Sequence, residues 1–223
     1  MDGITNEQVV ASNIYSTGKG TLRIVSGVVG NALDFSMGSG KYVDMGTFES
    51  SCIGNPSLCT FGLSISFWLR FISGQTNAYV FSNNASGLAV YLNGSTLNAS
   101  IQKGGQRWFV SASGLINESW YFVEVTWHPN SGLGLYLNQS MASSQVSGTV
   151  VTQGATGSAN LYLGQIGGNM SNRSNAMMTI DDLYIYNADR QQLLNINYII
   201  RGIVLLDEED DLILSSLNKL YRC

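Results

Sequence analysis

Short runs in which apolar and polar residues alternate recur along most of the chain, and they constrain the fold more than any other feature. Successive side chains of a β-strand point to opposite faces, so such alternation is typical of a strand that is buried on one face. Gly, Asn and Ser separate the runs, and Asn93-Gly94 is a strong hairpin signal. No long run with helical periodicity occurs before residue 188, so the sequence predicts an all-β fold of two antiparallel sheets around one core. The expected strands include residues 64–71, 88–92, 121–127, 133–137, 161–163 and 180–186.

The composition fits this fold class and excludes two classes of function. A chain of 223 residues suits a single β-sandwich or barrel domain. Charged residues make up 12% of it, about half of the roughly 25% that is usual in globular proteins. The formal net charge is -4 and no Lys/Arg cluster occurs, so we expect no binding to nucleic acid. No apolar run reaches the length of about 18 residues that a transmembrane helix requires, so we expect no membrane-spanning segment.

Seven Asn-x-Ser/Thr sequons bear on where the protein acts. Chance predicts about three or four in a chain so rich in Asn, Ser and Thr. The excess favours a glycosylated extracellular protein, and the alternative is a polar β-protein that is merely rich in Asn and Ser. Residues 1–6 lack the basic and apolar regions of a signal peptide, which indicates either a cytosolic protein or a fragment of a longer one. The candidate glycosylation sites are Asn84, Asn93, Asn98, Asn117, Asn138, Asn169 and Asn172.

The cysteines also favour an extracellular location. Cys52 and Cys59 bracket a segment that contains Asn55-Pro56, a turn signal that would bring the two thiols together. We therefore expect a disulfide between them, whereas two Cys and the single His cannot complete a zinc site. The odd cysteine, Cys223, is a free thiol, an intermolecular bridge or half of a pair whose partner lies outside this sequence.

The pattern changes towards the C-terminus. Residues 188–194 are typical of a short helix, and an acidic run at 207–211 precedes apolar residues at Ile213, Leu217 and Leu220. This spacing predicts a helix over 208–221 that packs on the sandwich or on a second copy. We therefore expect a β-sandwich domain at 1–200 and a helical tail, or the start of another module, at 201–223. A homodimer could form through this tail and Cys223.

The alternation also separates a core face from a candidate binding face. If one face of each strand fills the core, the opposite face carries several aromatic residues and an arginine, the residue types that anchor protein interfaces. The alternative is a second apolar layer beneath a long loop at 73–80 or 102–118. The core set is Ile65, Phe67, Leu69, Val123, Val125, Leu135 and Leu137. The candidate ligand-binding set is Trp68, Arg70, Tyr91, Phe122, Glu124 and Tyr136.

Eight short pieces occur in the order found in a known family, and over roughly residues 20–195 the chain resembles the laminin G-like, pentraxin-like group of the concanavalin A-like jelly rolls. The pieces are 27–35, 42–43, the Cys52…Cys59 pair ahead of Leu63-Ser64-Ile65-Ser66-Phe67-Trp68-Leu69, 120–121, 125–127, 132–138, 161–164 and 180–186.

The resemblance implies a two-sheet antiparallel jelly roll with a binding role. Members of the family bind glycans, other proteins or lipidic molecules, often with calcium. The cysteine pair ahead of the strand looks most like the version found in ectodomains of adhesion-type receptors and in large modular extracellular proteins.

Catalysis is not expected. Some jelly rolls cleave glycans with two carboxylates on one strand that flank the scissile bond. Here Glu124 stands alone, and the adjacent Asp181 and Asp182 would point to opposite faces of a strand. The only histidine, His128, lies before a turn, and no nucleophile motif accompanies it.

Calcium is a separate question, and the sequence leaves it open. Pentraxins supply an acidic Glu-Gln-Asp cluster at the position where this chain has Gln165 in a run without carboxylates, so that calcium site is not expected. Asp181 is the candidate ligand for a single structural calcium. The alternative, which we favour, is that Asp181 or Asp182 accepts hydrogen bonds from backbone N–H groups.

The sequence thus predicts a non-catalytic extracellular recognition or adhesion domain of a larger membrane-bound or secreted protein, which binds a protein partner and requires no cofactor. The alternative is a glycan-binding lectin domain that could depend on calcium.

Overall fold

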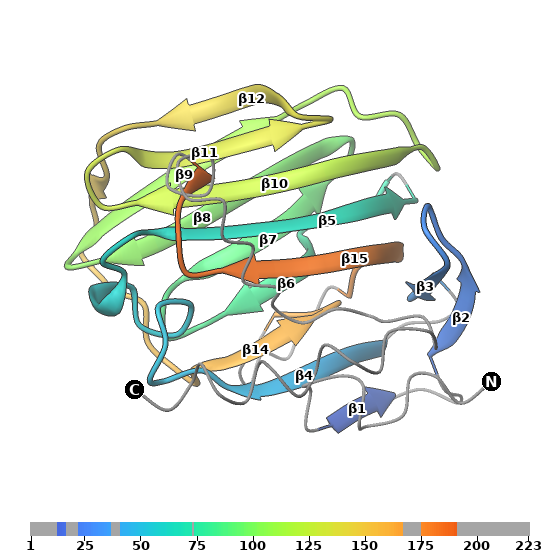
Figure 1. Cartoon of the computed structure of the whole chain (residues 1–223), viewed down its shortest axis with the longest axis horizontal. Coiled ribbons are helices and arrows are strands. Elements are labelled where there is room, and N and C mark those ends of the chain that lie inside the picture. The colour runs from blue at the N-terminus through green and yellow to red at the C-terminus, as the bar shows by residue number, and fades with distance from the viewer. Residues whose placement is uncertain (1–12, 17–21, 37–40, 73, 167–174, 191–223) are drawn as a thin grey trace.

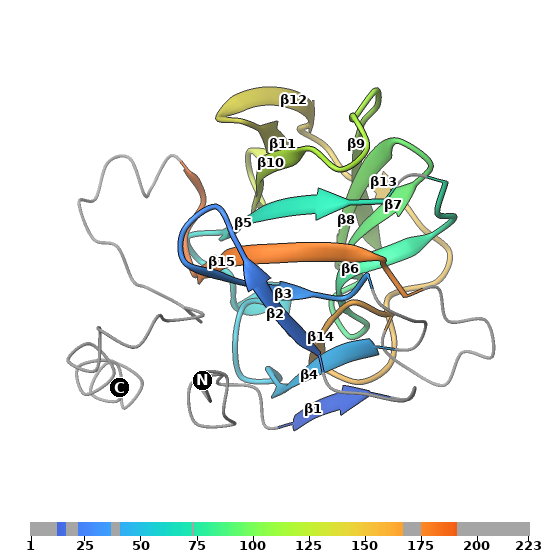
Figure 2. The same cartoon turned by 90° about the vertical axis from the view of Figure 1, so that its right-hand side faces the viewer.

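The computed structural model describes residues 13–16, 22–36, 41–72, 74–166 and 175–190, and these form two antiparallel β-sheets packed face to face (Figure 1). Figure 2 shows the two layers from the side, with β5 and β15 in one and β6, β7 and β8 in the other. The fold is therefore the expected antiparallel β-sandwich, and a short 3-10 turn, η1 (Pro56–Leu58), precedes β5. Among the described residues, no helix has both the length and the apolar character to cross a bilayer.

Fifteen strands make up the two sheets in the described part of the chain. The eight-stranded sheet has the order β1-β4-β14-β6-β7-β8-β9-β13, and the seven-stranded sheet has the order β12-β11-β10-β5-β15-β3-β2. The strands are β1 (Asn13–Ser16), β2 (Arg23–Ser26), β3 (Asn31–Asp34), β4 (Lys41–Thr47), β5 (Leu63–Phe71), β6 (Ala78–Asn83), β7 (Leu88–Asn93), β8 (Thr96–Lys103), β9 (Gln106–Ala112), β10 (Trp120–His128), β11 (Gly132–Leu137), β12 (Ser140–Gln145), β13 (Thr149–Val150), β14 (Asn160–Leu163) and β15 (Met178–Tyr186).

All six strands expected from alternation are present, and the inward faces form one core. Ile65, Phe67 and Leu69 of β5 are fully buried, as are Val123 and Leu135 from the neighbouring strands. Their burial confirms the predicted core face, because each lies at the apolar positions of the alternating pattern. The predicted hairpin at Asn93-Gly94 is also present. Asn93 pairs with Thr96 across a two-residue turn in which Gly94 has φ +63°, a backbone conformation that glycine adopts without strain.

One alternative from the sequence is wrong. The segments 73–80 and 102–118 do not form long loops over the predicted binding face. The first contains the start of β6 and the second contains β9, and both strands belong to the eight-stranded sheet. In β9 the buried residues Trp108, Val110 and Ala112 alternate with more exposed ones, so the second segment carries the pattern of a strand. Three further predictions lie outside the described residues: the domain boundary at 200/201, the helix at 208–221 and the state of Cys223. Of the helix predicted at 188–194, only residues 188–190 are described.

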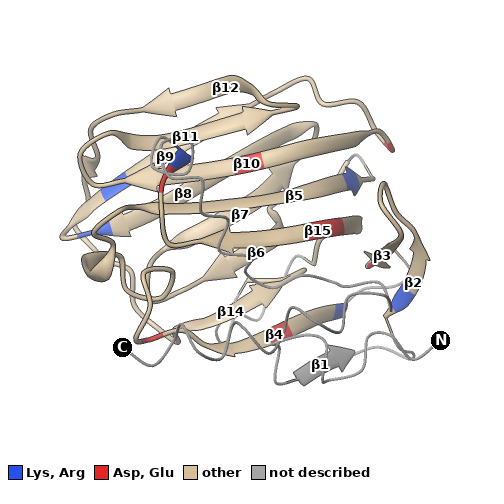
Figure 3. Cartoon of the chain, viewed as in Figure 1, with Lys and Arg blue, Asp and Glu red and all other residues tan. Residues whose placement is uncertain are grey.

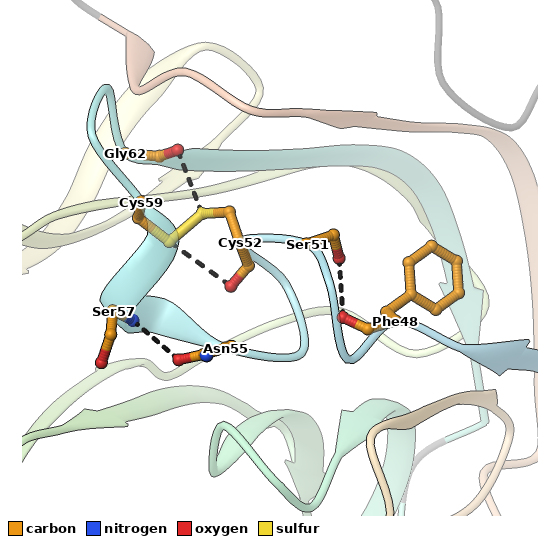
Figure 4. Close-up of a disulfide and its surroundings, with 7 residues drawn as sticks. All are labelled: Phe48, Ser51, Cys52, Asn55, Ser57, Cys59 and Gly62. Atoms are coloured by element: carbon orange, nitrogen blue, oxygen red, sulfur yellow. Dashed lines mark hydrogen bonds between the residues drawn. A yellow bond between two sulfur atoms is a disulfide. The ribbon is translucent and has the colours of Figure 1, made fainter. Parts of the chain in front are cut away.

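The predicted disulfide is present between Cys52 and Cys59, just ahead of β5 (Figure 4). Asn55 begins the η1 turn, and its side-chain oxygen accepts a hydrogen bond from the backbone N–H of Ser57 at 3.1 Å. Both cysteines are buried, and the Cys52 sulfur lies 3.3 Å from the carbonyl oxygen of Gly62, the residue that precedes β5. The disulfide therefore holds this loop against the start of a central strand of the seven-stranded sheet.

Candidate functional site

The predicted binding residues gather on the outer face of the seven-stranded sheet, with one exception. Trp68 pairs with Phe122 across β5 and β10, and Glu124 pairs with Tyr136 across β10 and β11. Because these positions alternate with the buried core residues, the side chains project away from the core. We call the face formed by Trp68, Arg70, Trp120, Phe122, Glu124, Tyr136, Thr179, Tyr184, Tyr186 and Arg190 the outer face.

Tyr91 does not belong to this face, and its assignment to the same set is wrong. It lies on β7 of the eight-stranded sheet, where it pairs with Tyr79, and the two rings lie 5.3 Å apart. Alternation gives the face of a residue within its own strand. It does not say to which of two sheets that strand belongs, and this is why the sequence grouped Tyr91 with residues of the other layer.

One half of the outer face is aromatic. The rings of Trp68 and Phe122 meet edge to face, with centroids 5.3 Å apart. Beside them the Arg70 guanidinium lies 5.0 Å from the ring centroid of Trp120 and donates a hydrogen bond to the Thr179 hydroxyl at 3.3 Å. No acidic side chain in the described part of the chain forms an ion pair with Arg70. This cluster therefore presents partly exposed rings together with a cation that has no anionic partner there.

The other half is held together by Arg190, a residue that the sequence did not single out. Arg190 follows β15 and lies across β10 and β11 on the outer face. Its Nη1 lies 2.6 Å from Oε2 of Glu124, and its guanidinium carbon lies 4.3 Å from the ring centroid of Tyr136. Its backbone N–H also donates to the Thr126 hydroxyl at 3.0 Å. Two of the predicted binding residues, Glu124 and Tyr136, are thus engaged within the chain.

Burial raises the pKa of the Glu124 carboxyl, and the positive charge of Arg190 opposes that shift. The Glu124 side chain is only 13% exposed and that of Arg190 is 28% exposed. A carboxylate so poorly hydrated depends on its arginine for compensation.

Further residues of the face were missed because their strand registers could not be read from the sequence. Tyr184 pairs with Ser66 and Tyr186 with Ser64, so both tyrosines join the outer face beside β5, where their rings stack 6.2 Å apart. A one-residue shift in the pairing between Asp181 and Tyr184 brings them to this side, because one extra residue of β15 reverses the alternation. The alternation in 180–186 was a usable signal, but the bulge within it was not visible.

Asp181 serves a structural role that agrees with the alternative favoured from the sequence. Its Oδ2 accepts hydrogen bonds from the backbone N–H groups of Val28 (2.7 Å) and Val29 (3.1 Å), which lie in the turn between β2 and β3. Gly27 permits this approach, because a Cβ there would lie 2.3 Å from Oδ2. The described residues contain no group of three or more His, Cys, Asp or Glu side chains that could hold a metal ion.

The carboxylates that the sequence singled out, Glu124, Asp181 and Asp182, have different surroundings. Glu124 is bound by Arg190, Asp181 is buried beneath the 27–30 turn, and burial together with the Asp181 charge raises the pKa of Asp182. His128 ends β10 at the expected turn, where its Nδ1 accepts a hydrogen bond from the backbone N–H of Asn130 at 3.1 Å. In the described part of the chain, the three carboxylates and His128 do not converge on one position where a substrate could react.

The sequons fall into three groups. Asn93, Asn117 and Asn138 are exposed, and Asn84 is partly exposed. Asn98 is only 7% exposed, and it lies on β8 between β7 and β9 of the eight-stranded sheet. Asn169 and Asn172 lie outside the described residues.

With this geometry established, comparison with known proteins identifies the family. A family model described as the concanavalin A-like lectin/glucanases superfamily, of laminin G type, matches residues 45–192. The chain belongs to this superfamily. The match covers the disulfide and every strand from β5 to β15, so the jelly-roll fold and the family resemblance are confirmed. No curated protein matches the chain.

Solved structures share the fold at low sequence identity. One is that of botulinum neurotoxin type C, described through its interaction with two ganglioside molecules, with a TM-score of 0.53 and 19% identity over 79% of this chain. Another is the binding domain of botulinum neurotoxin DC in complex with SialylT, with a TM-score of 0.55 and 18% identity over 80% of this chain. The present chain spans 44% of the length of each of these structures, and at this identity the likeness concerns the fold alone.

Proposed function

We propose that this jelly roll is a non-catalytic extracellular recognition domain, part of a larger membrane-bound or secreted protein, which binds a protein partner through the aromatic half of its outer face. The observation that carries the proposal is the cluster of Trp68 and Arg70 on β5 with Trp120 and Phe122 on β10. Among the described residues, Arg70 has no acidic partner and donates instead to Thr179 of β15. Tryptophan and arginine dominate the binding energy of protein interfaces.

The outer face suits a protein partner in its arrangement as well as its residue types. The rings pack against each other and against Arg70, so little side-chain freedom is lost on binding.

The non-catalytic and extracellular parts of the proposal have separate support. The carboxylates of the outer face are engaged by Arg190 or by the 27–30 turn, whereas a glycosidase needs two that face one bond. A disulfide within a small loop and several exposed sequons are typical of proteins that fold in an oxidising compartment.

A glycan ligand is the second candidate. It is supported by the two toxin structures whose descriptions name gangliosides and SialylT, and by the lectins within the superfamily. Aromatic rings also stack on sugars, so the same outer face could receive either ligand.

One experiment separates the candidates. The purified full chain is applied in parallel to an array of recombinant extracellular proteins and to a glycan array, with calcium and with a chelator. We expect a protein hit whose affinity falls by about 2 kcal/mol, roughly thirtyfold, in Trp68→Ala, and falls also in Arg70→Ala. Tyr91→Ala is the matched control, because it removes a half-buried aromatic ring from the other sheet.

Hits confined to the glycan array and sensitive to Trp68→Ala would replace the first candidate by the second. A hit that both outer-face variants bind as well as the parent does would place the site elsewhere on the molecule.

A further inference from the structure

One of the predicted sequons lies directly beside the outer face. Asn138 is the first residue of the two-residue turn that joins β11 to β12, because Leu137 before the turn pairs with Ser140 after it. Leu137 also pairs with Val123 of β10, so Asn138 lies across from Phe122, the preceding residue of that strand. Phe122 belongs to the aromatic half of the outer face, so a group attached to Asn138 would leave the protein next to that half.

Both the backbone and the side chain of Asn138 are bound to Phe122. Its backbone N–H donates to the Phe122 carbonyl oxygen at 2.8 Å, and its Oδ1 accepts from the Phe122 N–H at 3.0 Å. An N-linked glycan is attached through the side-chain nitrogen, Nδ2, and leaves Oδ1 able to accept. Asn138 is exposed, so it can carry a glycan without losing this contact, and the contact limits the directions in which the glycan can leave.

Asn93 is the matching case for comparison, because it is also exposed and also adjoins a two-residue hairpin turn. In the described part of the chain its side chain makes no hydrogen bond, so a glycan there has no fixed direction. Its partner across the turn is Thr96 rather than an aromatic residue. The two sequons therefore differ in the two features that would order a sugar, a held side chain and a neighbouring ring.

The surface around Asn138 suits a sugar. Phe122 and Tyr136 of the outer face are each only partly buried, and Tyr136 precedes Asn138 by two residues. Aromatic rings offer a rigid apolar face against which the C–H groups of a sugar can pack. Residues 125–172 contain no Lys, Arg, Asp or Glu, and Figure 3 shows β11 and β12 without a charged side chain. N-Acetylglucosamine, the first sugar of an N-glycan, is itself uncharged, so on this side no ion has to lose its water when the sugar packs.

We propose that the N-glycan of Asn138 is an ordered part of the outer face, with its first N-acetylglucosamine packed against Phe122 at the border of the aromatic half. The inference rests on the extracellular part of the proposed function. Only the folded chain brings Phe122 beside Asn138, so the contact stabilises the native state relative to the unfolded one. The glycan also closes this side of the aromatic half, which leaves a protein partner to approach from the side of Trp120 and Arg70.

The test is thermal unfolding of the full chain secreted from eukaryotic cells, with its glycans trimmed enzymatically to the first N-acetylglucosamine and the occupancy of each sequon measured by mass spectrometry. Ser140→Ala removes the Asn138 sequon but keeps Asn138. We expect it to lower Tm by roughly 2–4 °C, the shift that one aromatic packing contact gives in a domain of this size. Ser140→Thr keeps the sequon and should unfold with the parent. Ser95→Ala removes the Asn93 sequon at another exposed position and should also leave Tm unchanged.

Two further comparisons assign the effect to the glycan and to its contact. The parent and Ser140→Ala, both made without glycans in the bacterial periplasm, where the disulfide can form, should have the same Tm. In eukaryotic material that carries Phe122→Leu, which removes the ring and keeps an apolar side chain, Ser140→Ala should lower Tm no further.

The proposal is overturned if Asn138 carries no glycan while Asn93 does, an outcome that leaves the extracellular location standing. Glycans on none of the sequons would contradict that location as well. The proposal also fails if the glycosylated parent and Ser140→Ala unfold at the same temperature, if the bacterial pair differs by as much as the glycosylated pair, or if the difference persists with Phe122→Leu.

Discussion

Replacing Arg190 by alanine should destabilise the domain, because the substitution leaves the Glu124 carboxylate without its partner. The substitution removes the 2.6 Å ion pair with Glu124 and the contact with the Tyr136 ring, and it leaves Glu124 with only 13% of its side chain exposed. Breaking a fully buried ion pair by removing one partner costs about 3–5 kcal/mol. Because this pair is partly exposed to solvent, we expect about 1–2 kcal/mol, which lowers Tm by roughly 2–8 °C in a domain of this size.

The reasoning predicts a specific pattern among three variants. Glu124→Gln keeps the shape of the side chain and removes the charge, so it should cost less than Arg190→Ala. The double variant should be more stable than Arg190→Ala alone, because no unpaired charge is then buried. Thermal unfolding followed by circular dichroism at pH 7 would measure all three.

The pH dependence gives an independent check. Burial raises the pKa of Glu124, and Arg190 opposes that shift, so the pKa in Arg190→Ala should be higher than in the parent. The folded variant then binds a proton more readily than the unfolded chain does, and its stability rises as the pH falls through that pKa. The difference in Tm between the parent and Arg190→Ala should therefore shrink between pH 7 and about pH 4. An equal difference at both values, or a double variant less stable than the single one, would refute the explanation.

Three other predictions follow from the described structure. Removing the Cys52–Cys59 disulfide by serine substitution should cost about 2–3 kcal/mol in urea unfolding, since the closed loop is short, and an unchanged midpoint would contradict it. Asn98 should stay unglycosylated in material from eukaryotic cells while the exposed sequons carry glycan, because a 7% exposed side chain in mid-sheet is closed to the transferase; site-resolved mass spectrometry decides this. Gly27→Ala should cost about 1–3 kcal/mol, since its Cβ would lie 2.3 Å from Oδ2 of Asp181, whereas Gly154→Ala, with open space around it, should unfold at the parent's temperature.

Local patterns in the sequence were sufficient for the fold class and for the inward face of the strands. Alternation at 64–71 and 121–127 assigned Phe67 and Val123 to the core because the side-chain period of a strand is a property of the backbone itself. The turn at Asn55-Pro56 predicted the disulfide for a similar reason, since it acts within eight residues of chain. The glycosylation sites, the calcium question and the tail remain predictions.

The assignment of residues to one binding face needed the tertiary structure, because it depends on which strands are neighbours. Tyr91 and Tyr136 have the same alternating context, yet they lie in different sheets, and only the strand order separates them. Arg190 is far from Glu124 in sequence and carries no periodic signal, so its place on the outer face follows from where β15 ends. The place of β12 at the end of the seven-stranded order was hidden for the same reason, because pairing between strands is a long-range property that no local pattern encodes.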